Sequence, residues 1–190
     1  MADALALLLA GAFGSDLLLV YLIGICPAIA VSGKLQTAAG LAVSNAVVAP
    51  LAALLSYTLI ILLPDSAMAR MVELPLMVLS IIVCLYFVAS VAEKVWPAGH
   101  DWLEPFVPLM TVNCTLLGAV VLSLLAPKDG AEVLFYAFGL AAGYGVFIVV
   151  FSQIRERLAS APVPRAFQDA PISLISIAIV GMAMSGFGGL

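Results

Sequence analysis

The chain has 190 residues, of which 65% are hydrophobic and only 9% are charged, and its mean hydropathy is +1.24. A soluble globular domain carries about 25% charged residues, so this chain has too few charges to cover a water-facing surface. The net charge of −4 and the lack of a basic patch argue against nucleic acid as a partner. The composition therefore predicts an integral membrane protein.

Apolar segments of about 20 residues or more recur along the whole chain, separated by glycine, proline and charged residues. Because backbone hydrogen bonds in lipid must close within each segment, these runs are predicted helices. The sequence thus indicates an all-α integral membrane protein with about six transmembrane helices. We place the spans at approximately 5–32, 37–63, 72–93, 104–126, 132–154 and 170–189.

The first span is too long for one straight helix, and Asp16 interrupts it. Further on, Gly24 precedes Cys26 and Pro27 follows it. Glycine lowers helix stability and proline removes a backbone donor, so we expect the first helix to break here. Prolines and small polar residues also surround Cys114 in the fourth span. A second broken helix is expected at that point.

Cys26 and Cys114 lie 88 positions apart, and an acidic residue stands ten positions before each of them: Asp16 and Glu104. This spacing suggests one membrane unit used twice. Three spans in each half is an odd number, so the two units must have opposite orientations, as in an inverted-topology repeat. Within a single membrane domain, we expect the first repeat at 1–95 and the second at 96–190.

Lysine and arginine predict the orientation, because they are enriched in cytoplasmic loops. Five of them follow spans one, three and five, whereas two lie on the other side. This bias predicts that both termini face the periplasm. The first group is Lys34, Lys94, Arg155, Arg157 and Arg165, and the second is Arg70 and Lys128.

Two thiols at membrane depth can hold a metal, form a disulfide or simply pack. Iron–sulfur clusters usually have four thiolate ligands, so Cys26 and Cys114 would supply half a site and a related protein chain the rest. A Cys26–Cys114 disulfide is the chemical competitor. Cys84 lies in an unbroken apolar run and is interpreted as a packing residue. Asp16 and Glu104 are either ion ligands within the membrane or solvated residues at span boundaries.

Four segments together resemble the family that includes the A subunit of the Rnf complex and the E subunit of the sodium-pumping NADH:quinone oxidoreductase. The similarity covers essentially the whole chain. The proline after the first cysteine and the chain length favour the Rnf branch with its A subunit. The four segments are GICP at 24–27, PLMTVNC at 108–114, IRERL at 154–158 and GFGG at 186–189.

The resemblance implies six helices in an inverted repeat and one [2Fe–2S] cluster, shared with the homologous E subunit of the Rnf complex across a pseudo-two-fold axis. Only Cys26 and Cys114 match the ligand positions. It further implies an electron-transfer subunit of an ion-translocating ferredoxin:NAD oxidoreductase in the bacterial inner membrane. The other expected partners are the B, C, D and G subunits of the Rnf complex and the lipid bilayer. No flavin or NAD is expected on this chain, which has no G-x-G-x-x-G fingerprint.

Two other functions remain open at this point. A secondary transporter or channel would share the inverted repeat and the intramembrane acids, and would contain a substrate site without iron. A membrane thiol oxidoreductase would contain a Cys26–Cys114 disulfide. The residues around Asp16 depart from the family pattern, so the resemblance assigns Asp16 no role.

Overall fold

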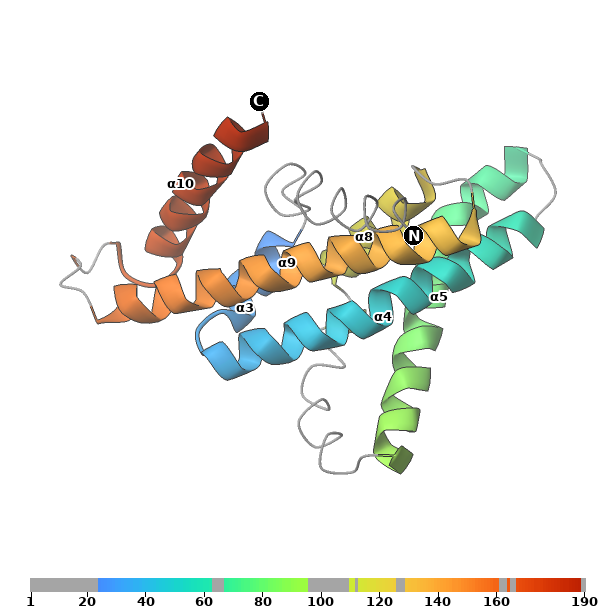
Figure 1. The fold of residues 1–190 in the computed structure, drawn as a ribbon, viewed down its shortest axis with the longest axis horizontal. Helices are drawn as coiled ribbons and strands as arrows, with labels where there is room; N and C mark the ends of the chain where they lie inside the picture. The colour runs from blue at the N-terminus through green and yellow to red at the C-terminus, as the bar shows by residue number, and fades with distance from the viewer. Residues whose placement is uncertain are drawn as a thin grey trace.

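The computed structural model describes residues 24–62, 67–95, 110–111, 113–125, 129–160, 164 and 167–188. Within these ranges the extended regular elements are all helices, which confirms the predicted all-α class (Figure 1). In chain order they are α3 (Ile25–Val31), α4 (Leu35–Leu62), α5 (Ala67–Val95), α8 (Cys114–Leu125), α9 (Gly130–Ala159) and α10 (Ala170–Gly188).

Three helices in the described ranges are long and apolar enough to cross a membrane: Leu35–Leu62, Met71–Val91 and Gly130–Ala159. Two shorter apolar helical stretches lie at Cys114–Leu125 and Ala170–Ala183. The predicted second, third and fifth spans thus coincide with α4, α5 and α9. Most of the predicted first span and the start of the fourth lie outside the described residues. The total of six spans therefore stays a prediction.

The centre of the molecule is the pair α4 and α9, which lie side by side and run in opposite directions (Figure 1). Small residues allow the two backbones to approach closely. A Cβ atom added at Gly145 would lie 3.2 Å from the Cβ of Ala42. Such close packing of small residues is typical of helix interfaces in membranes, where apolar burial alone gives little driving force.

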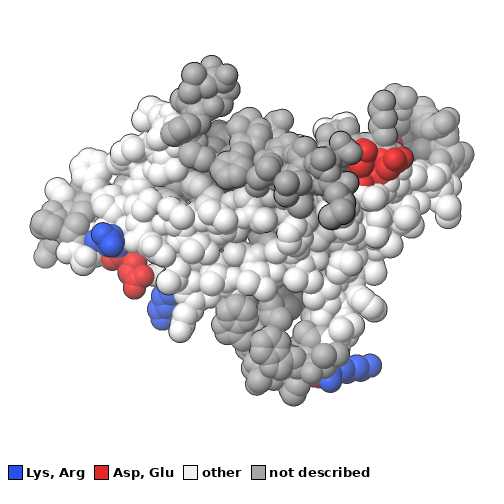
Figure 2. Space-filling view, in the orientation of Figure 1, with Lys and Arg blue, Asp and Glu red and all other residues white. Residues whose placement is uncertain are grey.

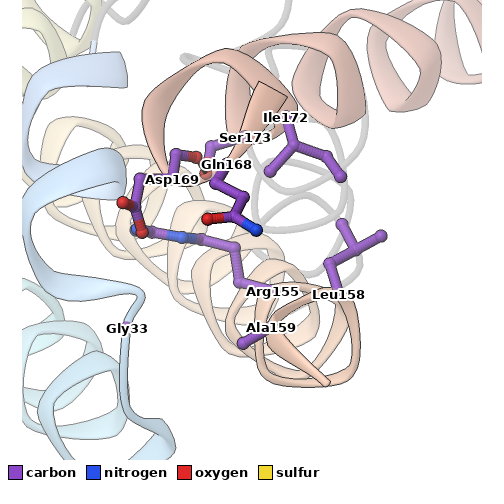
Figure 3. Close-up of a pocket in the computed structure, with 8 residues that line it drawn as sticks. All are labelled: Gly33, Arg155, Leu158, Ala159, Gln168, Asp169, Ile172 and Ser173. Atoms are coloured by element: carbon purple, nitrogen blue, oxygen red, sulfur yellow. Dashed lines mark hydrogen bonds between the residues drawn. The ribbon is translucent and has the colours of Figure 1, made fainter. Parts of the chain in front are cut away.

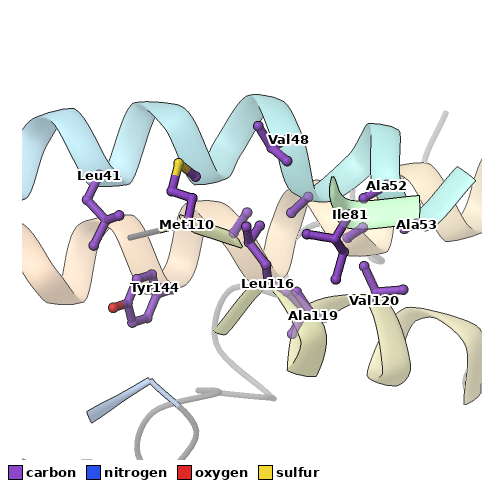
Figure 4. Close-up of a cluster of buried hydrophobic side chains, with 14 of the residues drawn as sticks. Leu41, Val48, Ala52, Ala53, Ile81, Met110, Leu116, Ala119, Val120 and Tyr144 are labelled. Atoms are coloured by element: carbon purple, nitrogen blue, oxygen red, sulfur yellow. The ribbon is translucent and has the colours of Figure 1, made fainter. Parts of the chain in front are cut away.

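The short helix α8 packs against both α4 and α9, and α5 contacts α4 and α8. Their shared core contains Leu41 of α4, Leu116 of α8 and Tyr144 of α9, each at most 1% exposed, together with Met110 (Figure 4). The sulfur-bearing side chain of Cys84, on α5, belongs to the same buried cluster. Two helices from the second half of the chain, α8 and α9, thus pack around α4.

Charged residues concentrate at the two ends of the α4–α9 pair, as the space-filling view shows (Figure 2). Because the two helices are antiparallel, the start of α4 and the end of α9 lie at the same end. Lys94, in the last turn of α5, lies away from this end, because α5 leaves the pair at a steep angle (Figure 1). The basic end holds Lys34, Arg155 and Arg157 with Glu156, and the opposite end holds Asp129 and Glu132.

Candidate metal centre

Cys26 is the second residue of α3, and the helix begins directly after Gly24. Gly24 adopts φ 102° and ψ 6°, in the left-handed region that favours glycine. Its carbonyl oxygen accepts the first helical hydrogen bond, from Ala28 N at 3.1 Å. Pro27 is the third residue of the helix, where its missing N–H would have no partner within the helix. The start of α3 at this glycine agrees with the predicted position of the break, but the residues before Gly24 lie outside the described ranges, so the broken first helix stays a prediction.

Cys114 is the first residue of α8, and Asn113 caps that helix. The Asn113 side-chain oxygen Oδ1 accepts a hydrogen bond from Thr115 N at 3.0 Å, which is the usual N-cap interaction. Asn113 itself is not helical, but residue 112 and the residues before 110 lie outside the described ranges, so the predicted break in the fourth span stays a prediction. Cys114 lies at the N-terminus of a 12-residue helix.

Tyr144 of α9 lies between the two cysteine segments. Its hydroxyl donates a hydrogen bond to the Gly24 carbonyl oxygen, with an O···O distance of 3.4 Å. The same hydroxyl lies close to Thr115 and to the thiol of Cys114. The Thr115 hydroxyl nevertheless makes no contact with hydrogen-bond geometry to any described residue. The structure thus brings the two predicted ligand segments to one buried tyrosine.

Arg155, three turns further along α9, binds the other end of α3. Its Nη1 atom donates to the Ile29 carbonyl oxygen at 2.5 Å and to Ser32 Oγ at 2.9 Å. The positive guanidinium suits this position, because the C-terminus of a helix presents unpaired carbonyls and a partial negative charge. Ser32 is fully buried. The Cys26 helix is therefore fastened to α9 at both ends.

A cleft of about 370 Å³ opens beside Arg155, between the end of α9 and the start of α10 (Figure 3). The polar part of its lining comes from Arg155, Gln168, Asp169 and Ser173. Ser173 Oγ donates to the Asp169 carbonyl oxygen at 2.8 Å, at the first turn of α10. The cleft lies at the basic end of the α4–α9 pair. It is near the end of α3, whereas Gly24 is at the start of that helix.

The two cysteines differ in exposure. Cys26 is exposed and Cys114 is partly buried. Two buried polar atoms beside Cys114, Asn113 Nδ2 and Thr115 Oγ1, have no hydrogen-bond partner among the described residues. Buried donors without partners are rare and call for an unseen acceptor, and cluster sulfur atoms are such acceptors. The donor set at Cys26 and Cys114 thus fits half of a four-thiolate iron–sulfur site.

Comparison with known proteins identifies the family. A family described as Rnf-Nqr subunit, membrane protein, matches residues 4–190. The chain belongs to the Rnf-Nqr family. Curated relatives named as the A subunit of the ion-translocating oxidoreductase complex are similar over the full chain. The protein from Shewanella oneidensis is 35% identical, with 99% of its length covered. Those from Pseudoalteromonas atlantica and Actinobacillus pleuropneumoniae serotype 5b are 36% and 34% identical, each with 98% covered.

In this Rnf-Nqr protein, the structure tests only some of the residues singled out in the sequence. Cys84 is buried in the core, as expected for a packing residue, and the three cysteines form no disulfide. No group of three or more potential metal ligands occurs within the described part of the chain. Asp16 and Glu104 lie outside the described residues.

Sequence reasoning missed Tyr144 and treated Arg155 as part of a basic loop segment. One available signal was their spacing of 11 residues on α9. At 3.6 residues per turn, this spacing places two side chains about three turns apart on one helix face. It could indicate that both residues face the same neighbour. It could not show that the neighbour is the Cys26 helix, which is 120 or more positions away.

Proposed function

We propose that this chain is the A subunit of an ion-translocating oxidoreductase complex and that it carries electrons through the membrane in an Rnf-type ferredoxin:NAD oxidoreductase. Cys26 and Cys114 would be two of the four thiolate ligands of a [2Fe–2S] cluster. Full-length similarity to relatives of that name supports the assignment to the complex. The observation that carries the proposed site is that both cysteines lie in the first two residues of a helix and that both segments lie beside Tyr144.

Each residue near the thiols has a distinct role in this proposal. A bound [2Fe–2S] cluster would supply one-electron transfer within the membrane. The thiols of Cys26 and Cys114 would bind iron, and Asn113 Nδ2 would donate a hydrogen bond to a sulfur atom. Hydrogen bonds to cluster sulfurs tune the reduction potential. The tightly packed α4–α9 pair excludes water from one side of the site.

The remaining two ligands would come from a homologous protein chain, for which the E subunit of the Rnf complex is the expected partner. The exposed thiol of Cys26 supports a shared site, because a ligand for an internal cluster would be covered by its own chain. The B, C, D and G subunits are the other expected members of the complex. We assign no flavin or nicotinamide to this chain.

We propose a bacterial inner-membrane location with both termini in the periplasm. The orientation rests on the basic end of the α4–α9 pair, since positive residues prefer the cytoplasmic side. Reporter fusions at the C-terminus should show periplasmic activity, and fusions beside Arg157 should show cytoplasmic activity. The reverse pattern would place the basic end of the α4–α9 pair on the periplasmic side.

The decisive experiment compares iron content and the paramagnetic resonance spectrum of the purified complex in three cysteine variants. Cys26→Ala and Cys114→Ala should each lose the intramembrane cluster signal and electron transfer, because a methyl group cannot bind iron. The control, Cys84→Ala, removes one buried sulfur and should cost only about 1 kcal/mol of stability. It should therefore keep iron and turnover.

Two outcomes would reject the proposal in favour of another class. A Cys26–Cys114 disulfide that cycles during turnover, in a complex without this iron, would indicate a thiol oxidoreductase. Equal and mild effects of all three cysteine changes would indicate packing roles, and a transporter or channel would become the better interpretation.

A further inference from the structure

The Cys26 helix is too short to hold its own position. α3 has seven residues, and no side chain caps its N-terminus. Seven residues make only about two helical turns, so α3 has few contacts of its own to fix its direction. The direction of the Cys26 thiol therefore depends on contacts that reach α3 from elsewhere in the chain.

Side chains of two helices make those contacts: Thr37 Oγ1 of α4 donates a hydrogen bond to the Val31 carbonyl oxygen at 2.7 Å, and two residues of α9 reach the two ends of α3. Tyr144 binds the Gly24 carbonyl, and Arg155 binds Ile29 and Ser32. Eleven residues of helix rise about 16 Å, whereas the eight steps from Gly24 to Ser32 rise about 12 Å. The two side chains can therefore bridge both ends of α3 at once.

Only the first of these two contacts also involves the other thiol segment. The Tyr144 hydroxyl faces Gly24, two residues before Cys26, and lies close to Cys114 and Thr115. The Tyr144 side chain is 1% exposed, and its ring packs in the core beside Leu41 and Met110 (Figure 4). The rigid Tyr144 ring thus places its hydroxyl oxygen between the start of α3 and the start of α8.

We infer that Tyr144 is a positioning residue, whose hydroxyl fixes the Cys26 segment relative to the Cys114 segment. The O···O distance of 3.4 Å exceeds the usual 2.5–3.0 Å for O–H···O bonds, so this contact is weak and sensitive to small displacements. The role of Tyr144 beside a cluster rests on the proposed function. Its role in holding the two segments rests on the contacts alone.

The first arm of the test uses the whole purified complex with Tyr144→Phe. This change removes the hydroxyl and keeps the ring in the core. We expect iron to be retained, and the midpoint potential and resonance line shape to shift from those of the unchanged complex. The matched control is Tyr86→Phe, at a tyrosine of α5 that is 58% exposed. It should leave both readouts unchanged.

The second arm does not require iron. The full chain, with Cys84→Ala as the background, is treated in membranes with a chelator and then with a flexible bifunctional maleimide. Cross-linking of Cys26 to Cys114 should become about twofold slower with Tyr144→Phe, which corresponds to about 0.5 kcal/mol, the lower end for one hydrogen bond. Tyr86→Phe should match the background rate.

The two arms separate failure of the inference from failure of the proposed function. Absence of iron from every preparation would reject the cluster, while the cross-linking rates would still decide the role of Tyr144. A Tyr144→Phe chain that cross-links at the background rate would overturn the inference. Failure of this variant to accumulate would also overturn it, because it would show that the hydroxyl is needed for folding.

Discussion

The helix that carries Cys114 has its own N-cap, whereas the helix that carries Cys26 has none and is bound at its start by a side chain from the other half of the chain. At its end, Arg155 from that half and Thr37 from its own half both bind it. Asn113 caps α8 from the adjacent position. The ends of α3 are bound by Tyr144 and Arg155, both on α9. Matched positions in the two halves of the sequence are thus supported by different means.

This difference affects how firmly each of the two thiols is held in a shared metal site. A self-capped helix keeps its thiol direction when distant parts of the chain change. A helix held by remote contacts responds to any movement of α9. We therefore expect Cys26 to be the more sensitive of the two ligand positions, and substitutions can test the two modes of support separately.

Arg155→Met should have the largest effect, and the effect should be confined to α3. Hydrogen bonds to charged groups are worth about 1.5–3 kcal/mol, and this change leaves the Ile29 carbonyl and Ser32 Oγ without their charged donor. Amide hydrogen exchange at residues 25–31 should therefore become more than about tenfold faster. Exchange in α8 should change little, so equal acceleration of both helices would contradict the comparison.

The matched control for Arg155 is Arg157→Met, at an exposed residue in the last turn of the same helix. It removes the same charge from the same end of the molecule without touching α3. If it accelerates exchange in α3 as strongly as Arg155→Met, the effect is one of general charge and the contact has no special role.

Gly145→Val should have an intermediate effect that reaches both segments, because it separates α9 from α4. The first added carbon alone would lie 3.2 Å from the Cβ of Ala42. Overpacking of this kind costs about 1–3 kcal/mol, which denaturant titration of the purified chain in detergent can measure. Gly33→Val is the control, since nothing lies within 4 Å of a Cβ atom at that position. Equal losses at both sites would show that the close approach is unimportant.

Asn113→Ala should have the smallest effect, confined to α8. Loss of an N-cap costs about 1 kcal/mol, so hydrogen exchange in the first turns of α8 should become about fivefold faster while α3 is unaffected. Asn113→Asp keeps the capping oxygen and removes the Nδ2 donor. It should restore slow exchange yet still shift the potential of the iron centre. No difference between the two variants would mean that Asn113 does not act as a cap.

Much of the fold could be predicted because lipid restricts the chain to helices and glycine, proline and charge mark where they end. The predicted span 37–63 and the observed α4, Leu35–Leu62, differ by only a few residues. The start of a helix beside Cys26 could be predicted from Gly24 and Pro27. The opposite orientation of the two halves and the roles of Asp16 and Glu104 remain predictions.

The contacts of the site could not be predicted from the sequence for a physical reason. Helix periodicity tells which residues share a face, but an apolar helix is hydrophobic on nearly all faces and gives no sign of which face meets which neighbour. Tyr144 therefore looked like one more aromatic residue of a span. Its partner, the Gly24 carbonyl, is a backbone atom and leaves no side-chain signature.

The fastening of α3 by Arg155 also sets an order of events during biosynthesis. Ile29 and Arg155 are 126 positions apart. At about 5–20 residues per second, the ribosome needs roughly 6–25 s to make the intervening chain. Throughout that interval α3 lacks the two α9 side chains that bind it, Tyr144 and Arg155. The start of α3 therefore gains its contact with Tyr144 only after α9 has been made, and under the proposed function iron would be loaded after that step.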